Sequence, residues 1–351
     1  MTVSPFDHPF LSGLFGDEEA SKLFTAEADI RAMLSFEAAL AEVEAEAGII
    51  KAGAAKAISK TCNSFKPNLP ALQDATRRDG VVVPELIRQL RKAVPSPHGK
   101  SLHFGATSQD VIDTSNVLRL KQLCKILDAR MKVVLSALSH LDKQHGTKTL
   151  MGRTRMQPAL PISVSDRINA WHAPLVRHRE RLIILSQSLL IVQFGGPVGT
   201  LDALGDKALA VRAALAKSLK LGDAPQWHSQ RDRLTEFASL LSLITGTLGK
   251  FGMDIALLAQ GGDEIVLHGG GGSSAMPHKQ NPVSAELLVT LAQFNAVQLS
   301  GMHLALVHEQ ERSGSAWSLE WMLLPQMAVA AAASLNLAQR VCGSIKSIGR
   351  E

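Results

Sequence analysis

Tyrosine is absent from this chain of 351 residues, and phenylalanine and tryptophan bring the aromatic share to only 4%. Proteins that hold nucleic acid by base stacking depend on aromatic side chains, and the 37 lysine and arginine residues here are dispersed along the sequence. The formal net charge of +5 at pH 7 therefore favours an anionic small molecule, steered into a positively lined cleft, over a nucleic-acid partner.

Cysteine is also scarce. Cys62, Cys124 and Cys342 are widely separated and form no CxxC pair, which argues against a disulfide framework and a cysteine-ligated zinc site. The pair His308-Glu309 does not continue to an HExxH motif. We therefore expect three core thiols and no metal site.

A basic-then-apolar N-terminal pattern is missing as well. The most apolar C-terminal stretch, Ala328 to Ala338, is shorter than the roughly 20 residues of a membrane span. With 46% hydrophobic residues, a chain of this length can bury a sizeable core. These features predict a soluble, cytoplasmic protein without a membrane partner.

What the sequence has instead is helical periodicity, with apolar residues recurring at steps of three and four. One such pattern runs from about Ala20 to Ala47, and Pro67 and Pro70 predict a break after it. A second helix is expected from Pro84, a favoured first-turn residue, to about Ala93. Residues 1–106 are therefore predicted to form a small N-terminal helical domain.

Five longer helical patterns follow. The first, Thr107 to Gln144, contains neither proline nor glycine and predicts a rod of roughly 55 Å at 1.5 Å per residue. The others run from about Ile162 to Val192, His228 to Gln260, Val283 to Gln310 and Trp317 to Cys342. We predict an all-α fold in which residues 107–345 form a bundle of five long helices and residues 346–351 a short tail. Such helices expose more apolar surface than one chain covers, so we expect subunits to associate.

The least regular stretch runs from Gly269 to Glu286 and reads GGGGSSAMPHKQNPVSAE. Four consecutive glycines disfavour helix and strand, and the hydroxyls and the lysine that follow precede a predicted helix start, where N–H groups attract anions. A glycine-rich linker is the alternative interpretation. Neither the P-loop spacing nor the dinucleotide spacing fits here.

This stretch resembles the GSSxMPxKxNP loop of the fumarase/aspartase superfamily, whose members abstract a proton next to a carboxylate and eliminate a β-substituent. The resemblance implies that Ser273 exchanges the carbon-bound proton. A serine hydroxyl is a poor base unless its alkoxide is stabilised, and the N–H groups of the glycine run are available for that role. Lys279 and Asn281 are implied to bind the carboxylate beside that carbon.

Residues 105–114, GATSQDVIDT, resemble the superfamily's TSxD segment. On its own the segment is a helix N-cap followed by acidic first-turn residues. The resemblance implies that Thr107 and Ser108 donate hydrogen bonds to a substrate carboxylate.

Residues 152–161, GRTRMQPALP, resemble the superfamily's T-H-x-Q-x-A-x-P segment. In that segment a histidine pairs with a glutamate and protonates the leaving group. Here Arg155 stands at the histidine position and Gln157 at the glutamine position, and the implied glutamate is Glu286. Two roles remain open for Arg155: an ion pair with Glu286, or a clamp on a substrate carboxylate.

The substitution by Arg155 bears on the leaving group, because arginine stays protonated and cannot shuttle a proton near neutral pH. An amine or hydroxide needs protonation to depart. A carboxylate, whose conjugate acid has a pKa of about 4, does not. Lactone opening and closing is a reaction of that kind.

Two further segments resemble the superfamily's carboxymuconate cycloisomerases. Residues 225–233, PQWHSQRDR, match their WHxQRD segment, and residues 311–321, ERSGSAWSLEW, match ERxxGxWxxEW with Ser315 at the glycine position. The resemblance implies substrate-binding roles for Arg77 and Arg312 and a supporting role for His228. An adenylosuccinate lyase would carry T-R-H-D-V near the first-domain site, whereas this chain has Arg78 at the histidine position.

The resemblance thus implies cofactor-free interconversion of a carboxymuconate, a small tricarboxylate, and its lactone in aromatic-acid catabolism. It also implies a homotetramer with sites shared between subunits. Superfamily members commonly continue into a third helical domain, which we expect to be largely absent here. The alternatives are an adenylosuccinate-type β-elimination lyase and a non-catalytic helical scaffold.

Overall fold

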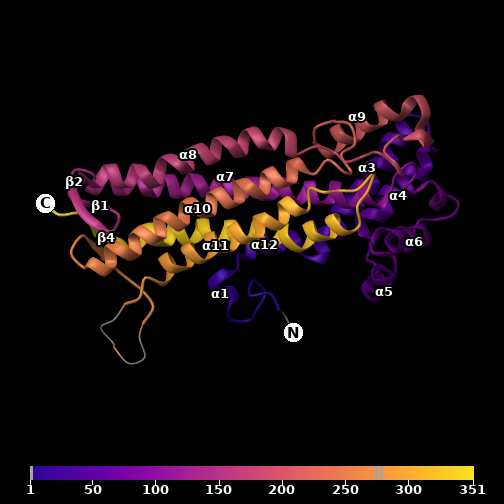
Figure 1. Ribbon diagram of the computed structural model, residues 1–351. Coiled ribbons are helices and arrows are strands. Elements are labelled where there is room, and N and C mark those ends of the chain that lie inside the picture. Colours follow the sequence, from indigo (N-terminus) through magenta and orange to yellow (C-terminus); the bar gives the residue numbers. More distant parts are fainter. Residues whose placement is uncertain (1–2, 273–275, 277–279) are drawn as a thin grey trace.

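The structure, a computed structural model, describes residues 3–272, 276 and 280–351. Long helices run side by side along an elongated molecule, with a group of smaller helices at one end and short strands at the other (Figure 1). Ser273 and Lys279, two of the predicted site residues, lie outside the described residues.

The N-terminal part is built from short helical elements. They are α1 (Ser12–Phe15), α2 (Glu18–Ser21), η1 (Lys22–Phe24), α3 (Ala26–Glu46), α4 (Ala52–Ser64), α5 (Leu69–Asp79), α6 (Val83–Ala93) and η2 (His98–Ser101). The periodicity predicts α3 and α6 but misses α4 and α5. Pro70 lies in the first turn of α5, because proline's fixed φ and missing N–H are tolerated there. The predicted break is therefore present at Pro67, between α4 and α5, whereas Pro70 belongs to the helix that follows it.

The five predicted long helices are confirmed. They are α7 (Ser108–His145), α8 (Val164–Leu189), α10 (Asp232–Gly261), α11 (Val283–Leu304) and α12 (Ser315–Ser344), with η3 (Asp202–Lys207) and α9 (Ala208–Leu219) between α8 and α10. α10 packs against α8, α11 and α12, while α7 packs against α8, α12 and α3. α11 ends six residues before the predicted Gln310, and the chain that follows it leads back to the start of α7. The boundaries of the two predicted domains stay a prediction.

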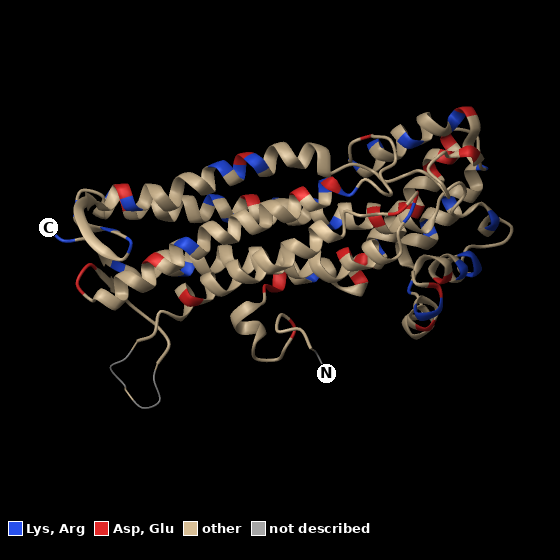
Figure 2. Ribbon diagram, in the orientation of Figure 1, with Lys and Arg blue, Asp and Glu red and all other residues tan. Residues whose placement is uncertain are grey.

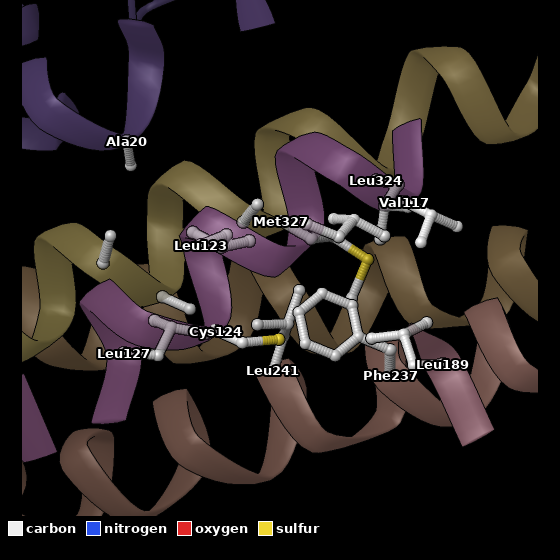
Figure 3. Close-up of a cluster of buried hydrophobic side chains, with 14 of the residues drawn as sticks. Ala20, Val117, Leu123, Cys124, Leu127, Leu189, Phe237, Leu241, Leu324 and Met327 are labelled. Carbon is white, nitrogen blue, oxygen red and sulfur yellow. The ribbon is translucent and has the colours of Figure 1, made fainter. Parts of the chain in front are cut away.

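The core lies between these helices, and Figure 3 shows part of it. Side chains at three-and-four spacing on α7 meet side chains of α8, α10 and α12, and all are at most 2% exposed: Val117, Leu123, Leu127, Leu189, Phe237, Leu241, Leu324 and Met327. Each such side chain contributes about 1.5–3 kcal/mol when it leaves water. Burial of the predicted apolar stripe is therefore the main source of stability for the bundle.

Two glycines let α10 and α11 cross closely. A Cβ atom on Gly249 would lie 2.5 Å from the Cβ of Ala292, and one on Gly252 would lie 2.4 Å from the carbonyl oxygen of Ala285. Because real side chains do not approach so closely, these positions require glycine for the crossing to form.

In the described part of the chain, four short strands close the other end of the bundle. β1 (Thr149–Thr154) and β2 (Gln157–Ser163) form an antiparallel hairpin, and β3 (Ile265–Leu267) pairs with β4 (Ile345–Ile348). A bridge between Thr149 and Arg350 joins the two small sheets. The sequence pattern does not predict these strands, because they are too short to show a clear alternation.

Among the described residues, α10 and α12 are long and apolar enough to span a membrane. Half of the most apolar window of α10 and 67% of that of α12 are buried inside the protein, as in core helices of soluble proteins. The stretch Ala328 to Ala338 is thus part of a longer apolar helix. The prediction of no membrane partner remains a prediction.

The three cysteines are free, buried thiols, as predicted. Burial raises the pKa of the Cys124 thiol to about 11 and those of Cys62 and Cys342 to about 12. All three therefore remain protonated at neutral pH.

Lysine, arginine, aspartate and glutamate are interspersed along the molecule (Figure 2).

Candidate functional site

The start of α7 brings together three of the segments that resemble the superfamily. Thr107, at the N-cap of α7, donates its backbone N–H to Asp110 Oδ2 at 3.0 Å. Arg312, from the segment between α11 and α12, donates from Nη2 to Thr107 Oγ1 at 3.2 Å and to the carbonyl oxygen of Pro197 at 3.2 Å. Ser108 is the first residue of α7 and is half-buried. Thr107, Ser108 and Arg312 thus form one group of hydrogen-bond donors.

His228, predicted as a supporting residue, lies under this group. Its Nε2 is 2.8 Å from Asp110 Oδ1, and both side chains are almost completely buried. Asp110 also accepts the backbone N–H groups of Gly195 and Gly196, each at 2.9 Å. The carboxylate of Asp110 therefore connects the loop after α8 to the helix start, and His228 fixes it from the α10 side.

A buried ionic cluster lies next along α7, which we call the Arg231 cluster: Asp113, Arg231 and Glu320. Arg231 donates two hydrogen bonds to Asp113, at 2.6 and 3.0 Å, and two to Glu320, at 2.8 and 2.6 Å. Its guanidinium stacks on the ring of Trp227 at 4.8 Å. Burial alone would lower the pKa of Arg231, but the two carboxylates outweigh burial and raise it.

The same cluster receives the Trp317 indole N–H, which donates to Asp113 Oδ1 at 3.0 Å. The segments resembling TSxD, WHxQRD and ERxxGxWxxEW therefore interlock at one place through buried, charge-assisted hydrogen bonds. The resemblance of these segments implied no roles for Asp113, Arg231 or Glu320. The sequence does hold one signal for them: Asp110 and Asp113 lie one turn apart on the buried face of α7, and buried carboxylates need a cation.

A cavity of about 420 Å³ adjoins the cluster between α3, α7 and α12. Three carboxylates line it, those of Asp29, Asp113 and Glu320, and Arg119 is the lining cation, held by Asp29 at 3.0 Å. Arg231 pairs with Asp113 and Glu320, so each carboxylate of the lining has a cationic partner.

A second buried acidic pair lies in the N-terminal part. Glu37 Oε1 is 2.6 Å from His103 Nδ1, and His103 precedes Thr107 by four residues in the chain. Glu44, on the same helix, is fully buried, and both of its carboxylate oxygens are unpaired among the described residues. Burial, assisted by the nearby carboxylate of Glu37, raises the pKa of Glu44 to about 8.

The predicted residues Arg155 and Gln157 lie at the opposite end of α7, on the β1–β2 hairpin. Both are exposed. Arg155 and Met156 form the two-residue loop of the hairpin with φ of +48° and +69°, the arrangement of a type I′ turn. At 1.5 Å per residue, the 38 residues of α7 place this hairpin roughly 55 Å from Thr107.

Asn281 and Glu286 also lie at the strand end of the bundle. Asn281 exchanges two backbone hydrogen bonds with Gly271, at 3.0 and 2.9 Å, and Glu286 is exposed in the first turn of α11. Between the described residues of one protomer, no ion pair joins Glu286 to Arg155. Within a single chain, Arg155 and Glu286 therefore do not form the ion pair that was one of the two possible roles of Arg155.

Arg77 stands apart from both groups. It lies in the last turn of α5, with a side chain that is 77% exposed and 3.9 Å from Asp74. One protomer thus holds Thr107, Ser108, His228 and Arg312 together and leaves Arg77, Arg155 and Gln157 on other surfaces.

In the part of the chain that the structure describes, no group of three or more histidine, cysteine, aspartate or glutamate side chains is arranged to hold a metal ion.

Comparison with known proteins defines the class. Residues 7–297 match the family described as lyase, and the chain belongs to the fumarase/aspartase superfamily. The chain is 39% identical to 3-carboxy-cis,cis-muconate cycloisomerase of Pseudomonas aeruginosa, over 90% of this chain and 71% of that enzyme. It is 32% identical to N-acetyl-S-(2-succino)cysteine lyase of Enterococcus italicus, over 97% of this chain and 76% of that enzyme.

Among solved structures, that of 3-carboxy-cis,cis-muconate lactonizing enzyme from Pseudomonas putida superimposes with a TM-score of 0.91 at 37% identity. The match covers 96% of this chain and 77% of that one. The mostly helical superfamily fold expected from the sequence is confirmed.

Proposed function

We propose that this protein interconverts 3-carboxy-cis,cis-muconate and 4-carboxymuconolactone. On this proposal, the reaction belongs to aromatic-acid catabolism and takes place in the cytoplasm. The substrate is a small tricarboxylate, and the reaction requires no cofactor, nucleic acid or membrane. The similarity to enzymes named for this reaction supports the proposal.

The observation on which the proposal mainly rests is the donor group at the start of α7. Because Arg312 Nη2 donates to Thr107 Oγ1, the hydroxyl hydrogen of Thr107 is free to donate to a ligand. The other terminal nitrogen of Arg312, Nη1, has no hydrogen-bond acceptor among the described residues. A hydroxyl and a guanidinium edge side by side suit a carboxylate.

The chemistry needs few groups. One carboxylate oxygen of the substrate attacks a carbon of the conjugated double bond and forms the lactone C–O bond. The displaced electron pair moves to the adjacent carbon and delocalises into its carboxylate, and that carbon then takes one proton, which we assign to Ser273. The protein has to orient the carboxylates and stabilise the delocalised charge, a role that we assign to Lys279 and Asn281.

The chain's departure from the superfamily pattern at Arg155 is consistent with this reaction. In the reverse direction the leaving group is a carboxylate, which departs without a general acid. An amine-eliminating lyase would need the acid that Arg155 cannot supply. We assign Arg155 and Gln157 to carboxylate binding, together with Arg77, and keep Glu286 and His228 as supporting residues.

We further propose that the working unit is a homotetramer in which one site takes residues from several subunits. The two groups of site residues lie at opposite ends of a helix roughly 55 Å long, too far apart to act on one small molecule. The bundle also exposes apolar side chains on α8, α11 and α12 that association would cover: Ile183, Ile184, Val297, Leu304 and Met322.

The test is turnover of purified protein with 3-carboxy-cis,cis-muconate and, separately, with adenylosuccinate. We expect the muconate to react and Ser273→Ala to lower kcat by roughly 100-fold or more, the scale of losing an acid–base group. Turnover of adenylosuccinate alone would favour the β-elimination lyase, and turnover of neither would favour the helical scaffold.

Shared sites predict complementation. Arg312→Met and Arg155→Met damage opposite ends of the protomer, so each variant alone should have a reduced kcat/KM, and activity is compared at a substrate concentration well below the KM of either variant. After the two are unfolded, mixed and refolded together, some mixed tetramers contain intact sites and activity should return. A mixture that stays as inactive as its parts would contradict sharing between subunits.

A further inference from the structure

Gln109, the second residue of α7, connects the donor group to the Arg231 cluster. Its Oε1 accepts from Arg312 Nε at 3.0 Å. Its Nε2 donates to the carbonyl oxygen of His228 at 2.8 Å and to Asp113 Oδ2 at 3.1 Å. The residue is fully buried. Every hydrogen-bonding neighbour of this amide is thus fixed by the fold.

The orientation of the amide follows from its neighbours. Arginine only donates, whereas a backbone carbonyl and a carboxylate only accept, so one orientation alone satisfies all three contacts. Glutamate would lose both donors and place a negative charge about 3 Å from Asp113. An apolar residue of the same length would leave Arg312 Nε and the carbonyl of His228 without this partner. Glutamine therefore matches the site in shape and in polarity.

We propose that Gln109 is a positioning residue that sets the direction of the Arg312 guanidinium. With Nε held by Gln109 and Nη2 held by Thr107 and Pro197, three hydrogen bonds fix the plane of the group, and Nη1 is left at its free edge. Gln109 is itself held by Asp113, which Arg231 fixes with two further bonds. The Arg231 cluster thus orients the substrate-facing edge of Arg312 through one buried amide.

This inference rests on the proposed function in one respect, the assignment of Arg312 to carboxylate binding. The orientation of Arg312 is independent of that assignment. Two measurements therefore separate the two ideas: one follows the guanidinium itself, and the other follows a ligand.

The first measurement is the rate at which phenylglyoxal modifies Arg312, followed by peptide mass spectrometry. The variants are Gln109→Met, which removes every hydrogen bond at similar length, and Gln109→Glu, which keeps an acceptor for Arg312. Gln122→Met is the matched control, since Gln122 is exposed on the same helix. We expect faster modification of Arg312 in Gln109→Met only. Equal rates in all four proteins would overturn the proposal.

The second measurement is calorimetric binding of propane-1,2,3-tricarboxylate. Losing a hydrogen bond to a charged group predicts an affinity loss of roughly 10- to 100-fold in Gln109→Met. We expect a similar loss in Gln109→Glu, because an adjacent carboxylate neutralises Arg312, and none in Gln122→Met. If Gln109 acts through Arg312, adding Gln109→Met to Arg312→Met should change affinity by less than about 2-fold. Fully additive losses would overturn the proposal.

Steady-state kinetics separate a positioning role of Gln109 from a purely structural one, because the two roles predict different changes in KM and kcat. KM for the muconate should rise with the affinity loss while kcat changes by less than about 3-fold, since the contact is present before the chemical step. If Gln109→Met fails to fold, Gln109→Glu with unchanged affinity would also overturn the proposal. A parent protein that binds no tricarboxylate, with Arg312 still released by Gln109→Met, would refute the proposed function and support the positioning role.

Discussion

The two ends of the central bundle hold their polar side chains in different ways. At the start of α7, Thr107, His228 and Arg312 are bonded to one another or to buried carboxylates within a single protomer. At the strand end, Arg155 and Gln157 are exposed on a two-stranded hairpin. One end is preorganised by its own chain, whereas the other has no partner for its arginine among the described residues.

This difference shows where structural order comes from in the molecule. A carboxylate buried in the bundle requires a cation, and the cation in turn fixes the neighbouring loops. The β1–β2 hairpin is anchored at its base, where Leu150 is fully buried and Thr149 bridges to Arg350, whereas its tip at Arg155 and Gln157 is exposed. If sites are shared between subunits, the ordered end of one subunit meets the exposed end of another.

The largest effect is expected from removing the centre of the ordered end. Arg231→Met leaves Asp113 and Glu320 buried without their cation and should lower the free energy of unfolding by about 3–5 kcal/mol. Urea denaturation measures the change. The control is Arg31→Met, because the Arg31–Glu27 pair is about three-quarters exposed and should contribute less than about 1 kcal/mol.

A rescue experiment sharpens this test. Adding Asp113→Asn and Glu320→Gln to Arg231→Met removes the unpaired charges and should restore part of the lost stability. If Arg231→Met were no worse than Arg31→Met, the cluster would not be the source of order at this end.

The second effect concerns Glu44, the buried carboxylate that lacks a cation. The folded protein keeps a proton on Glu44 up to about pH 8, whereas an unfolded glutamate releases it near 4.5. The folded state therefore binds more protons between these values, and its stability falls as pH rises through this window. The loss between pH 5 and pH 7 should be about 2–3 kcal/mol.

Glu44→Gln should remove that loss. Urea denaturation at pH 5 and pH 7 should show a smaller pH dependence in this variant than in the parent protein, while Glu46→Gln, an exposed position on the same helix, should behave as the parent does. An unchanged pH dependence in Glu44→Gln would mean that Glu44 is ionised in the folded state, or that it lies in contact with a cation.

Sequence reasoning located the long helices because their apolar stripe follows the helical period without interruption, as on α7 from Leu120 to Leu141. It missed α4 and α5, and it predicted a break at Pro70, which instead lies in the first turn of α5, because proline can begin a helix as well as end one. The strands were missed because three to seven residues are too few to show a clear alternation. β3 and β4 in addition depend on pairing between segments far apart in the chain, such as Ile265 with Ile348.

The candidate site was predicted unevenly for a similar reason. Thr107, Ser108 and Arg312 belong to segments that resemble the superfamily, and the structure brings them together. The Arg231 cluster joins residues more than 80 positions apart, so no local pattern connects them. Gln109 occupies the variable position of TSxD, and its role follows only from the three neighbours that surround it.

The third effect tests the exposed end through Arg155. If the leaving group is a carboxylate, Arg155→His should not speed the reaction, because no proton is delivered there. Loss of arginine's two-pronged contact should weaken substrate binding by roughly 1–3 kcal/mol if that contact is direct. Steady-state kinetics across pH 6 to 9 measure both quantities.

The parent protein should show no ionisation from Arg155 in this range, because arginine stays charged throughout. If Arg155→His instead raised turnover and introduced an ionisation near pH 6.5, an acid would be useful at this position. An amine-eliminating lyase would then be the better assignment, and the exposed end would supply an acid rather than a clamp.

The smallest effect concerns the backbone of the hairpin. Met156 adopts φ of +69°, a conformation that glycine adopts with less strain than methionine, and its side chain is 70% exposed, so its removal loses little burial. Met156→Gly should therefore raise stability, by up to about 1 kcal/mol. Leu160→Gly on β2 is the matched control, since Leu160 is 74% exposed and has no positive φ, and glycine there should lower stability by about 0.5–1 kcal/mol. If Met156→Gly raises the free energy of unfolding in urea while Leu160→Gly lowers it, the strain lies in the turn that presents Arg155. If both variants lower it by the same amount, the turn is unstrained, and the exposed end differs from the ordered end only in its missing partners.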